Sequence, residues 1–313
     1  MESSACDWTG ADIGLMRSLL FVPGDSERKL ARGFDTGADA LILDLEDSVA
    51  APRKAAARAL VAQCLQERAA GISLWVRINP LSTPLAAEDL ASVVAGRPAG
   101  LVVPKLKAPR ELGTLASELA QLERRHGISE GATKLLPIAT ETPASLFTMT
   151  GYAEIGPRLE ALTWGAEDLS AALGAATAVD GDGEWLFTYQ LARSLCLAAA
   201  AAAGVGAVDT VYTDFRDTDG LRRQSLQARR DGFTGKLAIH PDQIPIINEA
   251  FRPSSDEIAD ARRVVAAFDA AGDAASQDAG ATGVVALNGK MLDRPHLLRA
   301  RRLLALAGKC KRR

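Results

Sequence analysis

Charged and polar side chains follow short apolar runs at separate places along the chain. The run "ALIL" at 40–43 is followed by three carboxylates within the next four residues. Runs of this kind lead into Asp44, Glu46, Asp47, Arg77, Lys105, Glu141, Glu167, Asp168, Asp214 and His240. A carboxylate in a place of low dielectric constant is costly unless a cation or a hydrogen-bond donor meets it. The fold must therefore either open these positions to water or gather them around a cation or a substrate.

The acids indicate a particular kind of metal chemistry. Carboxylate oxygens with no cysteine among them and only three histidines in the chain favour Mg²⁺, or Mn²⁺, over zinc. Glu141 and Asp168 are the predicted ligands because they end adjacent predicted strands, and Mg²⁺ commonly takes only one or two protein carboxylates. Arg77 can form a forked pair with a substrate carboxylate or carbonyl oxygen. We therefore predict that Arg77 and Glu141 bind the substrate.

The spacing of apolar residues predicts strands that alternate with helices. Strands are predicted at 18–24, 40–47, 74–80, 100–106, 135–143, 161–168, 209–214 and 235–241. The Ala-, Leu-, Arg- and Glu-rich segments between them have helical spacing, which indicates a parallel sheet built from strand–helix units. Eight such units predict a (β/α)8 TIM barrel, with a doubly wound open sheet as the alternative. In a barrel the carboxyl ends of the strands face the active site, so the polar residues above would converge on one mouth.

The pattern changes after the eighth predicted strand. A helix is predicted at 254–271, then a small, polar, Gly-rich hinge at 272–283, then a hairpin-like segment and a last helix. We therefore divide the chain into an N-terminal tail (1–16), a catalytic barrel (17–252) and a C-terminal helical extension (253–313). The extension would act as a lid over the barrel.

The composition bounds the class of protein. The chain has 313 residues, 48% hydrophobic and 24% charged, with a formal net charge of -3. This balance offers no general attraction to nucleic acid or to anionic membranes, and no run is apolar enough to span a bilayer. The start of the chain does not have the pattern of a signal peptide. Cys6, Cys64, Cys196 and Cys310 are scattered, so the prediction is a cytoplasmic protein without a disulfide framework.

Eight motifs, in order and spread over the chain, carry a resemblance to a known family. They are "RSLLFVPGDSERKL", "ALILDLEDSV", "WVRINP", "LVVPK", "PIATETP", "GAEDLSAALG", "DTVYTDFRDTDGL" and "GFTGKLAIHPDQI". Together they resemble the citrate lyase beta-subunit-like family, which includes malyl-CoA and citramalyl-CoA lyases within the HpcH/HpaI aldolase superfamily. The resemblance runs from about residue 17 to 308. It implies a barrel, a Mg²⁺ site, a homotrimer or hexamer, and carbon–carbon lyase chemistry on hydroxyacyl-CoA thioesters.

The resemblance also assigns roles to matching residues. Glu141 of "ATETP" and Asp168 of "GAED" match the metal ligands, and Arg77 of "VRIN" matches the substrate-binding arginine. Asp293 of "NGKMLDRP" matches the acid that the C-terminal segment contributes to a neighbouring subunit's site. In the cleavage direction a 2-oxo acid and an acetyl-CoA enolate would form. Arg77 would stabilise the developing negative charge, and Asp293 would protonate the enolate.

The remaining site predictions have structural alternatives. Asp44, Glu46, Asp47 and Lys105 are predicted to surround the metal and orient its waters, although Arg77 and Lys105 could instead form structural ion pairs with the acids. Phe21, Arg28 and Lys29 are the predicted CoA-binding residues, because they flank the Gly24 turn that opens a helix. Core packing for Phe21 and a solvated basic face for Arg28 and Lys29 are the alternatives.

The same residues leave more than one activity open. A thioesterase that releases malate or a similar acid would use the same site. A citrate lyase beta subunit would act instead on an acyl carrier protein. A CoA-independent aldolase is a fourth, weaker alternative. The tail with "NGKMLDRP" favours a self-contained enzyme that acts on CoA thioesters and takes or releases a 2-oxo acid.

Overall fold

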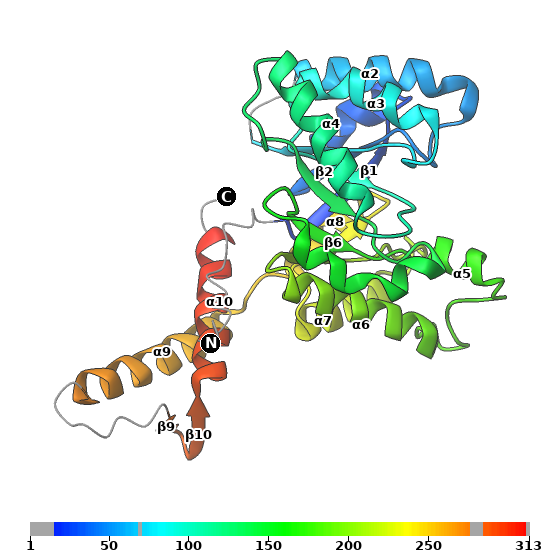
Figure 1. The fold of residues 1–313 in the computed structure, drawn as a ribbon. Helices are drawn as coiled ribbons and strands as arrows, with labels where there is room; N and C mark the ends of the chain where they lie inside the picture. Colours follow the sequence, from blue (N-terminus) through cyan, green and yellow to red (C-terminus); the bar gives the residue numbers. More distant parts are fainter. Residues whose placement is uncertain (1–15, 68–70, 276–283, 311–313) are drawn as a thin grey trace. The chain divides into compact units, whose positions relative to one another are not determined.

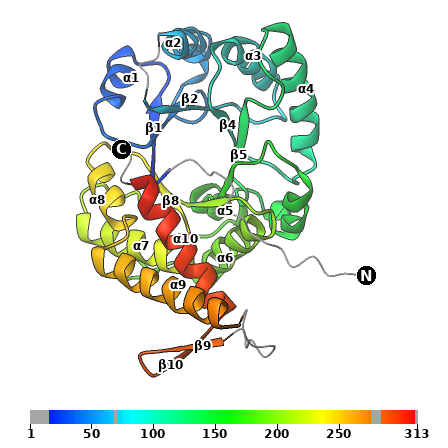
Figure 2. The same ribbon diagram turned by 90° about the vertical axis from the view of Figure 1, so that its left-hand side faces the viewer.

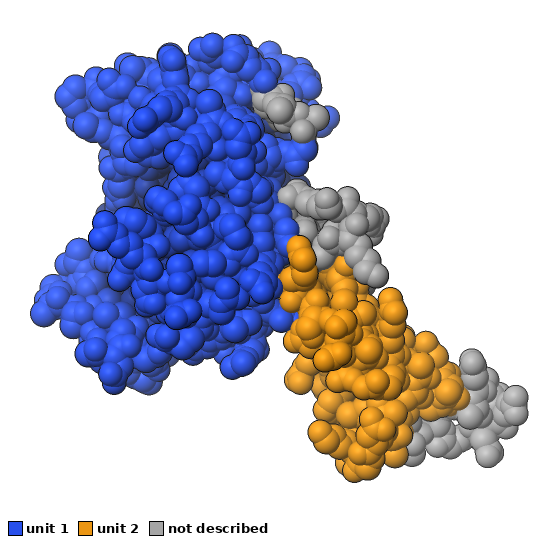
Figure 3. All heavy atoms as spheres, turned by 180° about the vertical axis from the view of Figure 1, so that it is seen from behind, with its two compact units in different colours: residues 1–251 blue, residues 252–313 orange. Residues whose placement is uncertain are grey.

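The computed structural model describes residues 16–67, 71–275 and 284–310. The chain divides into two compact units, with the boundary between Phe251 and Arg252 (Figure 3). The predicted N-terminal tail, residues 1–16, lies outside the described residues except for Met16. Each unit is described by itself below.

The first unit is a barrel of eight parallel strands surrounded by helices (Figures 1 and 2). The strands are β1 (Ser18–Pro23), β2 (Ala40–Asp44), β3 (Ser73–Arg77), β4 (Gly100–Val103), β5 (Lys134–Pro137), β6 (Ala161–Thr163), β7 (Gly206–Asp209) and β8 (Gly235–Ala238). Their order is β5-β4-β3-β2-β1-β8-β7-β6. The ring closes between β5 and β6, where Leu135 N donates to Arg158 O at 2.8 Å and Ala139 N to Thr163 O at 2.7 Å. The predicted (β/α)8 class is confirmed.

Helices cover the outside of the ring. They are α1 (Glu27–Gly33), α2 (Lys54–Gln66), α3 (Pro84–Val93), α4 (Glu111–Arg125), α5 (Ala166–Leu173), α6 (Phe187–Ala202), α7 (Thr218–Asp231) and α8 (Gln243–Ala250). The connection from β5 to β6 departs from this rule, because it uses two 3₁₀ segments, Pro143–Phe147 and Met149–Glu154. Among the described residues, no helix has the length and apolarity needed to cross a bilayer.

The period-two geometry of the strands sorts their side chains into two apolar layers. Leu19, Ile42 and Trp75 belong to a cluster contributed by successive strands inside the ring. Leu20 and Leu41, one position away, belong to a larger cluster between the ring and its helices. Burial on both faces explains why the strands read as nearly continuous apolar runs. It also fixes which side chains point into the barrel mouth at the strand ends.

The prediction for the seventh strand was wrong by several residues. The strand was expected at 209–214, but β7 is Gly206–Asp209, and 210–214 form a loop that runs from the buried Thr210 to the exposed Asp214. Small residues in "GAVD" have weak strand propensity, whereas "DTVYTD" contains β-branched residues and a tyrosine. The prediction therefore placed the strand too close to the C-terminus. Asp214 therefore lies beyond the strand end, where its carboxylate accepts from Arg216 N at 3.0 Å.

The second unit contains two helices and a hairpin. They are α9 (Ser255–Ala275), β9 (Val284–Leu287), β10 (Lys290–Asp293) and α10 (Arg294–Cys310). The strands β9 and β10 are antiparallel, with Asp293 opposite Val284. The helix predicted at 254–271 is longer than expected, since 272–275 continue α9 in place of the first part of the predicted hinge. The rest of that hinge, 276–283, lies outside the described residues.

One glycine inside the barrel gives a test of this packing. A Cβ added at Gly100 on β4 would lie 2.3 Å from Trp75 Cζ3 and 2.7 Å from Lys134 O. We expect Gly100→Ala to lower the free energy of unfolding by roughly 1–3 kcal/mol, because the indole must shift in a close-packed interior. The measurement is urea unfolding followed by circular dichroism.

Gly113 on α4 provides the matched control. A Cβ there would have no atom within 4 Å, so Gly113→Ala should leave stability unchanged or raise it by up to about 1 kcal/mol. Equal losses for the two variants would contradict the packing described for the barrel interior.

Candidate active site

Three neighbouring strands place an aromatic ring, a carboxylate and a guanidinium group at one end of the barrel. In β1, Phe21 packs on the same inner cluster as Leu19; in β2 and β3, Asp44 and Arg77 are two residues beyond Ile42 and Trp75. Because side chains two apart share a face, all three point inward. The parallel register pairs Asp44 directly with Arg77.

Arg77 and Asp44 form a forked ion pair. Arg77 Nε and Nη2 donate to the two oxygens of Asp44 at 2.7 and 2.6 Å, and Asp44 also accepts from Glu46 N and Ser48 N. Burial tends to raise the pKa of Asp44, but the hydrogen bonds and charge of Arg77 outweigh it and lower that pKa below its ordinary value. Opposing acids likewise keep the pKa of Arg77 above its usual range despite burial. Both shifts favour the charged forms, so the two groups stay paired as ions over a wider pH range than the free side chains would.

The rest of the Arg77 guanidinium faces an aromatic ring and two further acids. Its centre lies 4.5 Å from the centroid of the Phe21 ring, a cation–π arrangement. Nη1 lies 3.2 Å from Glu46 Oε2 and 3.6 Å from Asp47 Oδ2. Phe21, which was predicted to bind CoA, thus packs against the guanidinium group of Arg77 in this structure.

Lys105, in the loop after β4, contacts four acids that come from three segments. Its ammonium lies 2.7 Å from Glu46, 3.0 Å from Asp47 and 3.5 Å from Asp168, while its backbone N–H donates to Glu141 Oε2. Its backbone is left-handed, with φ of 54°, which is uncommon for a residue with a side chain. These contacts hold the residue in a conformation that the chain alone disfavours.

Glu141 and Asp168 face the same place from neighbouring segments. Glu141 follows β5 and is 4% exposed; Asp168 is in the first turn of α5, where the helix dipole favours a carboxylate. Burial raises the pKa of Glu141 well above its ordinary value, and the charges of Asp168 and Glu46 add to the effect against the Lys105 N–H. Glu167, the alternative to Asp168, is exposed.

The carboxylates in this cluster outnumber the cations that face them. The five acids Asp44, Glu46, Asp47, Glu141 and Asp168 face three cations, because Lys54 acts on Asp44, Glu46 and Asp47 in addition to the ion pairs of Arg77 and Lys105. Glu46 Oε2 is buried and has no hydrogen-bond donor, only its ionic contact with Arg77. The unbalanced negative charge and the oxygen-only donor set fit a hard divalent cation.

The part of the chain that the structure describes contains no cluster of three or more His, Cys, Asp or Glu arranged to hold a metal. A bound Mg²⁺ would thus rely on two protein carboxylates, Glu141 and Asp168. Water and substrate oxygens would complete its coordination, as is usual for this ion.

Several residues that support the acids were missed by sequence reasoning. Lys54 Nζ donates to the carbonyls of Leu45 and Glu46 at 2.6 and 2.7 Å, and Asn79 Nδ2 donates to Leu45 O at 3.0 Å. These bonds fix the backbone that carries Glu46. Asn79, two residues after Arg77 in "VRINP", offered a signal, since it shares the face of Arg77.

Gly165 was also missed. A Cβ there would lie 2.8 Å from Glu141 Cγ, so only glycine lets the β6–α5 turn approach the buried carboxylate. Nothing in the sequence around Gly165 marks this contact, because it joins two segments 24 residues apart.

The other predicted residues belong to other segments of the chain. Arg28 and Lys29 are exposed on α1, and His240 stacks on Phe215 with ring centroids 4.8 Å apart. Asp293 lies in the second unit, where its Oδ1 is 2.5 Å from His296 Nδ1.

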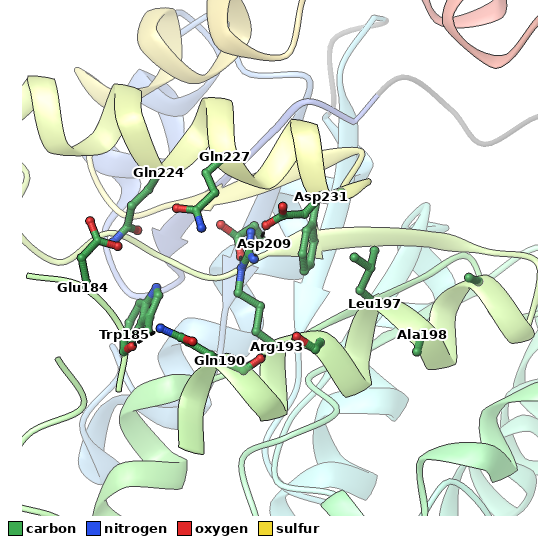
Figure 4. A pocket seen from close by; sticks show the side chains of 13 residues that line it. Glu184, Trp185, Gln190, Arg193, Leu197, Ala198, Asp209, Gln224, Gln227 and Asp231 are labelled. Carbon is green, nitrogen blue, oxygen red and sulfur yellow. Dashed lines mark hydrogen bonds and ion pairs between the residues drawn. The ribbon is translucent and has the colours of Figure 1, made fainter. Parts of the chain in front are cut away.

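A groove of about 480 Å³ between α6 and α7 is a separate feature (Figure 4). Its ionic groups pair with one another: Arg193 contacts Asp209 at 3.1 Å and Asp231 at 2.6 Å. Trp164 Nε1 donates to Asp209 at 2.7 Å from behind. None of the acids of the barrel mouth lines the groove.

Charged side chains gathered at the carboxyl ends of barrel strands are typical of an active site. Residues 17–241 match the model of the HpcH/HpaI aldolase/citrate lyase family, and the chain belongs to that family. It is therefore an enzyme, and several of its curated relatives are named lyases. Its resemblance to the citrate lyase beta-subunit-like group is thereby confirmed.

Two curated relatives and one solved structure illustrate the likeness. The chain is 34% identical to citrate lyase subunit beta of Leuconostoc mesenteroides subsp. cremoris, over 94% of this chain and 93% of that protein. It is 35% identical to the mitochondrial citramalyl-CoA lyase of Rattus norvegicus, over 94% and 87%. The crystal structure of Mycobacterium tuberculosis CitE, in complex with magnesium, acetoacetate and coenzyme A, matches with a TM-score of 0.74 at 32% identity. That match covers 95% of this chain and 99% of CitE.

The environment of Glu141 predicts an unusual effect on stability. Because its pKa is raised by folding, the ionised carboxylate costs free energy in the metal-free protein. We expect Glu141→Gln to raise the free energy of unfolding, by about 1.4 kcal/mol for each pH unit by which the native pKa exceeds the unfolded one. The gain should be full above the native pKa, shrink as the pH falls through it, and vanish below about pH 4. Chemical unfolding in EDTA between pH 4 and 9 measures it.

Asp44→Asn serves as the comparison, because it removes a carboxylate whose pKa folding lowers. That variant should lose stability above the unfolded pKa of the acid, by roughly 3 kcal/mol for a broken buried ion pair. A loss of stability in both variants at pH 8 would contradict the difference between the two acids.

Proposed function

We propose that this enzyme is a Mg²⁺-dependent carbon–carbon lyase that cleaves, or forms, a 3-hydroxyacyl-CoA thioester such as malyl-CoA or citramalyl-CoA. The products of cleavage would be acetyl-CoA and a 2-oxo acid. One observation carries the proposal: Glu141 is buried beside Asp168 in a cluster that lacks enough cations to neutralise it. A carboxylate kept in this state is costly without a positive ion, and enzymes tolerate such costs where the charge is used.

Glu141 and Asp168 would hold the ion, with Mn²⁺ as a possible substitute. When bound, the ion supplies Lewis-acid polarisation of the substrate's oxygens. Lys105 separates the two ligands from Glu46 and Asp47, because its ammonium contacts three of these acids. The outer carboxylates would accept hydrogen bonds from water bound at the site.

Arg77 would stabilise the substrate oxygen on which negative charge develops. The two hydrogen bonds to Asp44 and the cation–π contact with Phe21 restrict the motion of the guanidinium group. The hydrogen-bond donors of Arg77 are therefore oriented before the substrate binds. Arg28 and Lys29, exposed at the start of α1, would contact the CoA phosphates, with Phe21 at the inner end of that path.

Asp293 would move the proton at carbon. In cleavage it would protonate the enolate of the thioester, and in synthesis it would take a proton from acetyl-CoA. The extension that carries it, residues 253–313, would act as a lid over an active site. That site would belong either to its own subunit or to a neighbouring subunit in a homotrimer or hexamer. We further propose a cytoplasmic enzyme that acts by itself on CoA esters, with an acyl carrier protein as the alternative acyl donor.

Product analysis tests the function. Purified enzyme is incubated with malyl-CoA or citramalyl-CoA, with Mg²⁺ or with EDTA, and the products are identified by liquid chromatography and mass spectrometry. We expect acetyl-CoA with glyoxylate or pyruvate, a loss of turnover in EDTA, and a fall of at least about 100-fold in Glu141→Gln and Asp168→Asn, as expected when electrostatic stabilisation of the transition state is removed. Glu167→Gln, at the exposed neighbouring acid, is the matched control and should keep full turnover.

Three outcomes would contradict the proposal in different ways. Free CoA with intact malate or citramalate would make the enzyme a thioesterase that uses the same site. Turnover in the presence of EDTA would show that the reaction does not need a metal ion. Turnover of acyl-carrier-protein esters alone would make it a citrate lyase beta subunit.

A further inference from the structure

The acid proposed for proton transfer has a partner on its own chain. His296 Nδ1 lies 2.5 Å from Asp293 Oδ1, and the side chains are 43% and 53% exposed. Of the chain's three histidines, the other two have different surroundings: His240 stacks on Phe215, and His126 caps the end of α4. The pair sits where β10 ends and α10 begins.

The local chain geometry brings the two residues together. Asp293 directly precedes α10, at the position of the helix N-cap, and His296 is the third helical residue. Asp293 N donates to His296 Nδ1 at 3.3 Å. This is the return bond of a capping box, which commonly uses Glu or Gln at the third position. Capping by itself would thus account for a polar residue at 296.

The short contact between carboxylate and imidazole goes beyond capping. Two bare acceptors would repel each other at 2.5 Å, so the contact of Nδ1 with Oδ1 places a hydrogen between them, on Nδ1 or on the carboxyl group. When Nε2 also carries a hydrogen, a proton on Nδ1 gives imidazolium and carboxylate, and the same proton on Oδ1 gives neutral imidazole and carboxylic acid. Either way, two groups share one proton along one short hydrogen bond.

We propose that His296 is the positioning residue and proton partner of Asp293, so that the two work as one acid–base pair. The inference rests on the proposed lyase function and extends it. In cleavage, the carboxyl proton of Asp293 forms the new C–H bond of acetyl-CoA and leaves a carboxylate. The pair regains one proton from water through the half-exposed imidazole. The substrate hydroxyl releases one proton to the medium, so the overall reaction is proton-neutral.

The charged residues nearest to the pair in sequence are the bases Lys290, Arg294 and Arg299. Asp269 on α9 faces Arg301, further along α10, at 3.9 Å. Within the described part of the chain, the carboxyl group in contact with the His296 ring is that of Asp293.

His296→Gln separates proton sharing from capping. Glutamine returns the capping bond to Asp293 N but cannot share a proton with the carboxylate. We expect kcat for the CoA ester to fall about 10–100-fold with KM within twofold, the range of a partial loss of acid–base catalysis. The pH dependence of kcat should also change, and the melting temperature should stay within about 2 °C of wild type. His296→Ala should lose activity to a similar extent and also lose some stability.

A second readout does not depend on activity. The ring N–H proton signals of the three histidines are recorded by NMR, and those of His296 are assigned by their loss in His296→Gln. We expect the Nδ1 proton of His296 to resonate downfield in wild type and to move upfield in Asp293→Asn, because a neutral amide oxygen accepts a weaker hydrogen bond than a carboxylate.

The results separate the possible failures. Unchanged kcat and pH profile in His296→Gln would overturn the inference and leave a capping residue. A His296 Nδ1 proton signal that does not move in Asp293→Asn would overturn it as well. If instead wild type cleaves no CoA ester, or Asp293→Asn is fully active, the proposed function or the role of Asp293 fails, while the NMR result still decides whether the pair shares a proton.

Discussion

The forked ion pair between Asp44 and Arg77 is the interaction on which the mouth of the barrel depends. It joins the ends of two neighbouring strands and uses both oxygens and two of the guanidinium nitrogens. Removing Asp44 would take the forked partner from the buried Arg77, and removing Arg77 would leave the buried Asp44 carboxylate with backbone N–H donors in place of its counter-charge. Breaking such a pair is far more costly than never burying it. With Arg77 fixed in this way, its third nitrogen and the ammonium of Lys105 determine where the outer acids lie. The Lys54 and Asn79 bonds to the Leu45–Glu46 backbone hold the segment from below.

The same constraint leaves one acid uncompensated. Arg77 and Lys105 are engaged with Asp44, Glu46 and Asp47, so Glu141 receives only a backbone N–H from Lys105 and lies under the charge of Asp168. Gly165 keeps the space beside it narrow. The barrel thus creates a place where negative charge is concentrated and poorly solvated. The same concentrated negative charge would attract a divalent ion and would lower the stability of the metal-free protein.

The sequence was sufficient for the barrel and for Asp44 and Arg77 at strand ends, because burial on both faces and period-two alternation leave clear traces in composition. Asp168 and Asp214, also expected at strand ends, lie in α5 and in the loop after β7. An ion pair of Arg77 with the acids was an open alternative from the sequence, but the forked pairing with Asp44 depends on the register between β2 and β3. Lys105 and Gly165 act through contacts between segments far apart in sequence, and the left-handed backbone of Lys105 has no signature in "VVPKLK". In the seventh strand, by contrast, a local sequence signal was misleading. Strand propensity favoured "DTVYTD", but the segment that pairs with β6 and β8 is "GAVD". The pairing of His296 with Asp293 follows from helix capping, yet the sequence indicated only the acid.

Calorimetric titration of Mg²⁺ into the metal-free enzyme tests the central claim most directly. The heat is measured at one pH in two buffers of different ionisation enthalpy, which gives the number of protons released on binding. A raised pKa at a ligand predicts proton release, because the ion must displace the proton that Glu141 holds. We predict that wild type binds Mg²⁺ with proton release near the native pKa of Glu141. Glu141→Gln and Asp168→Asn should lose most of the affinity, and Glu167→Gln should match wild type. Binding of equal affinity in Glu141→Gln would show that the buried carboxylate is not a metal ligand and would contradict the account.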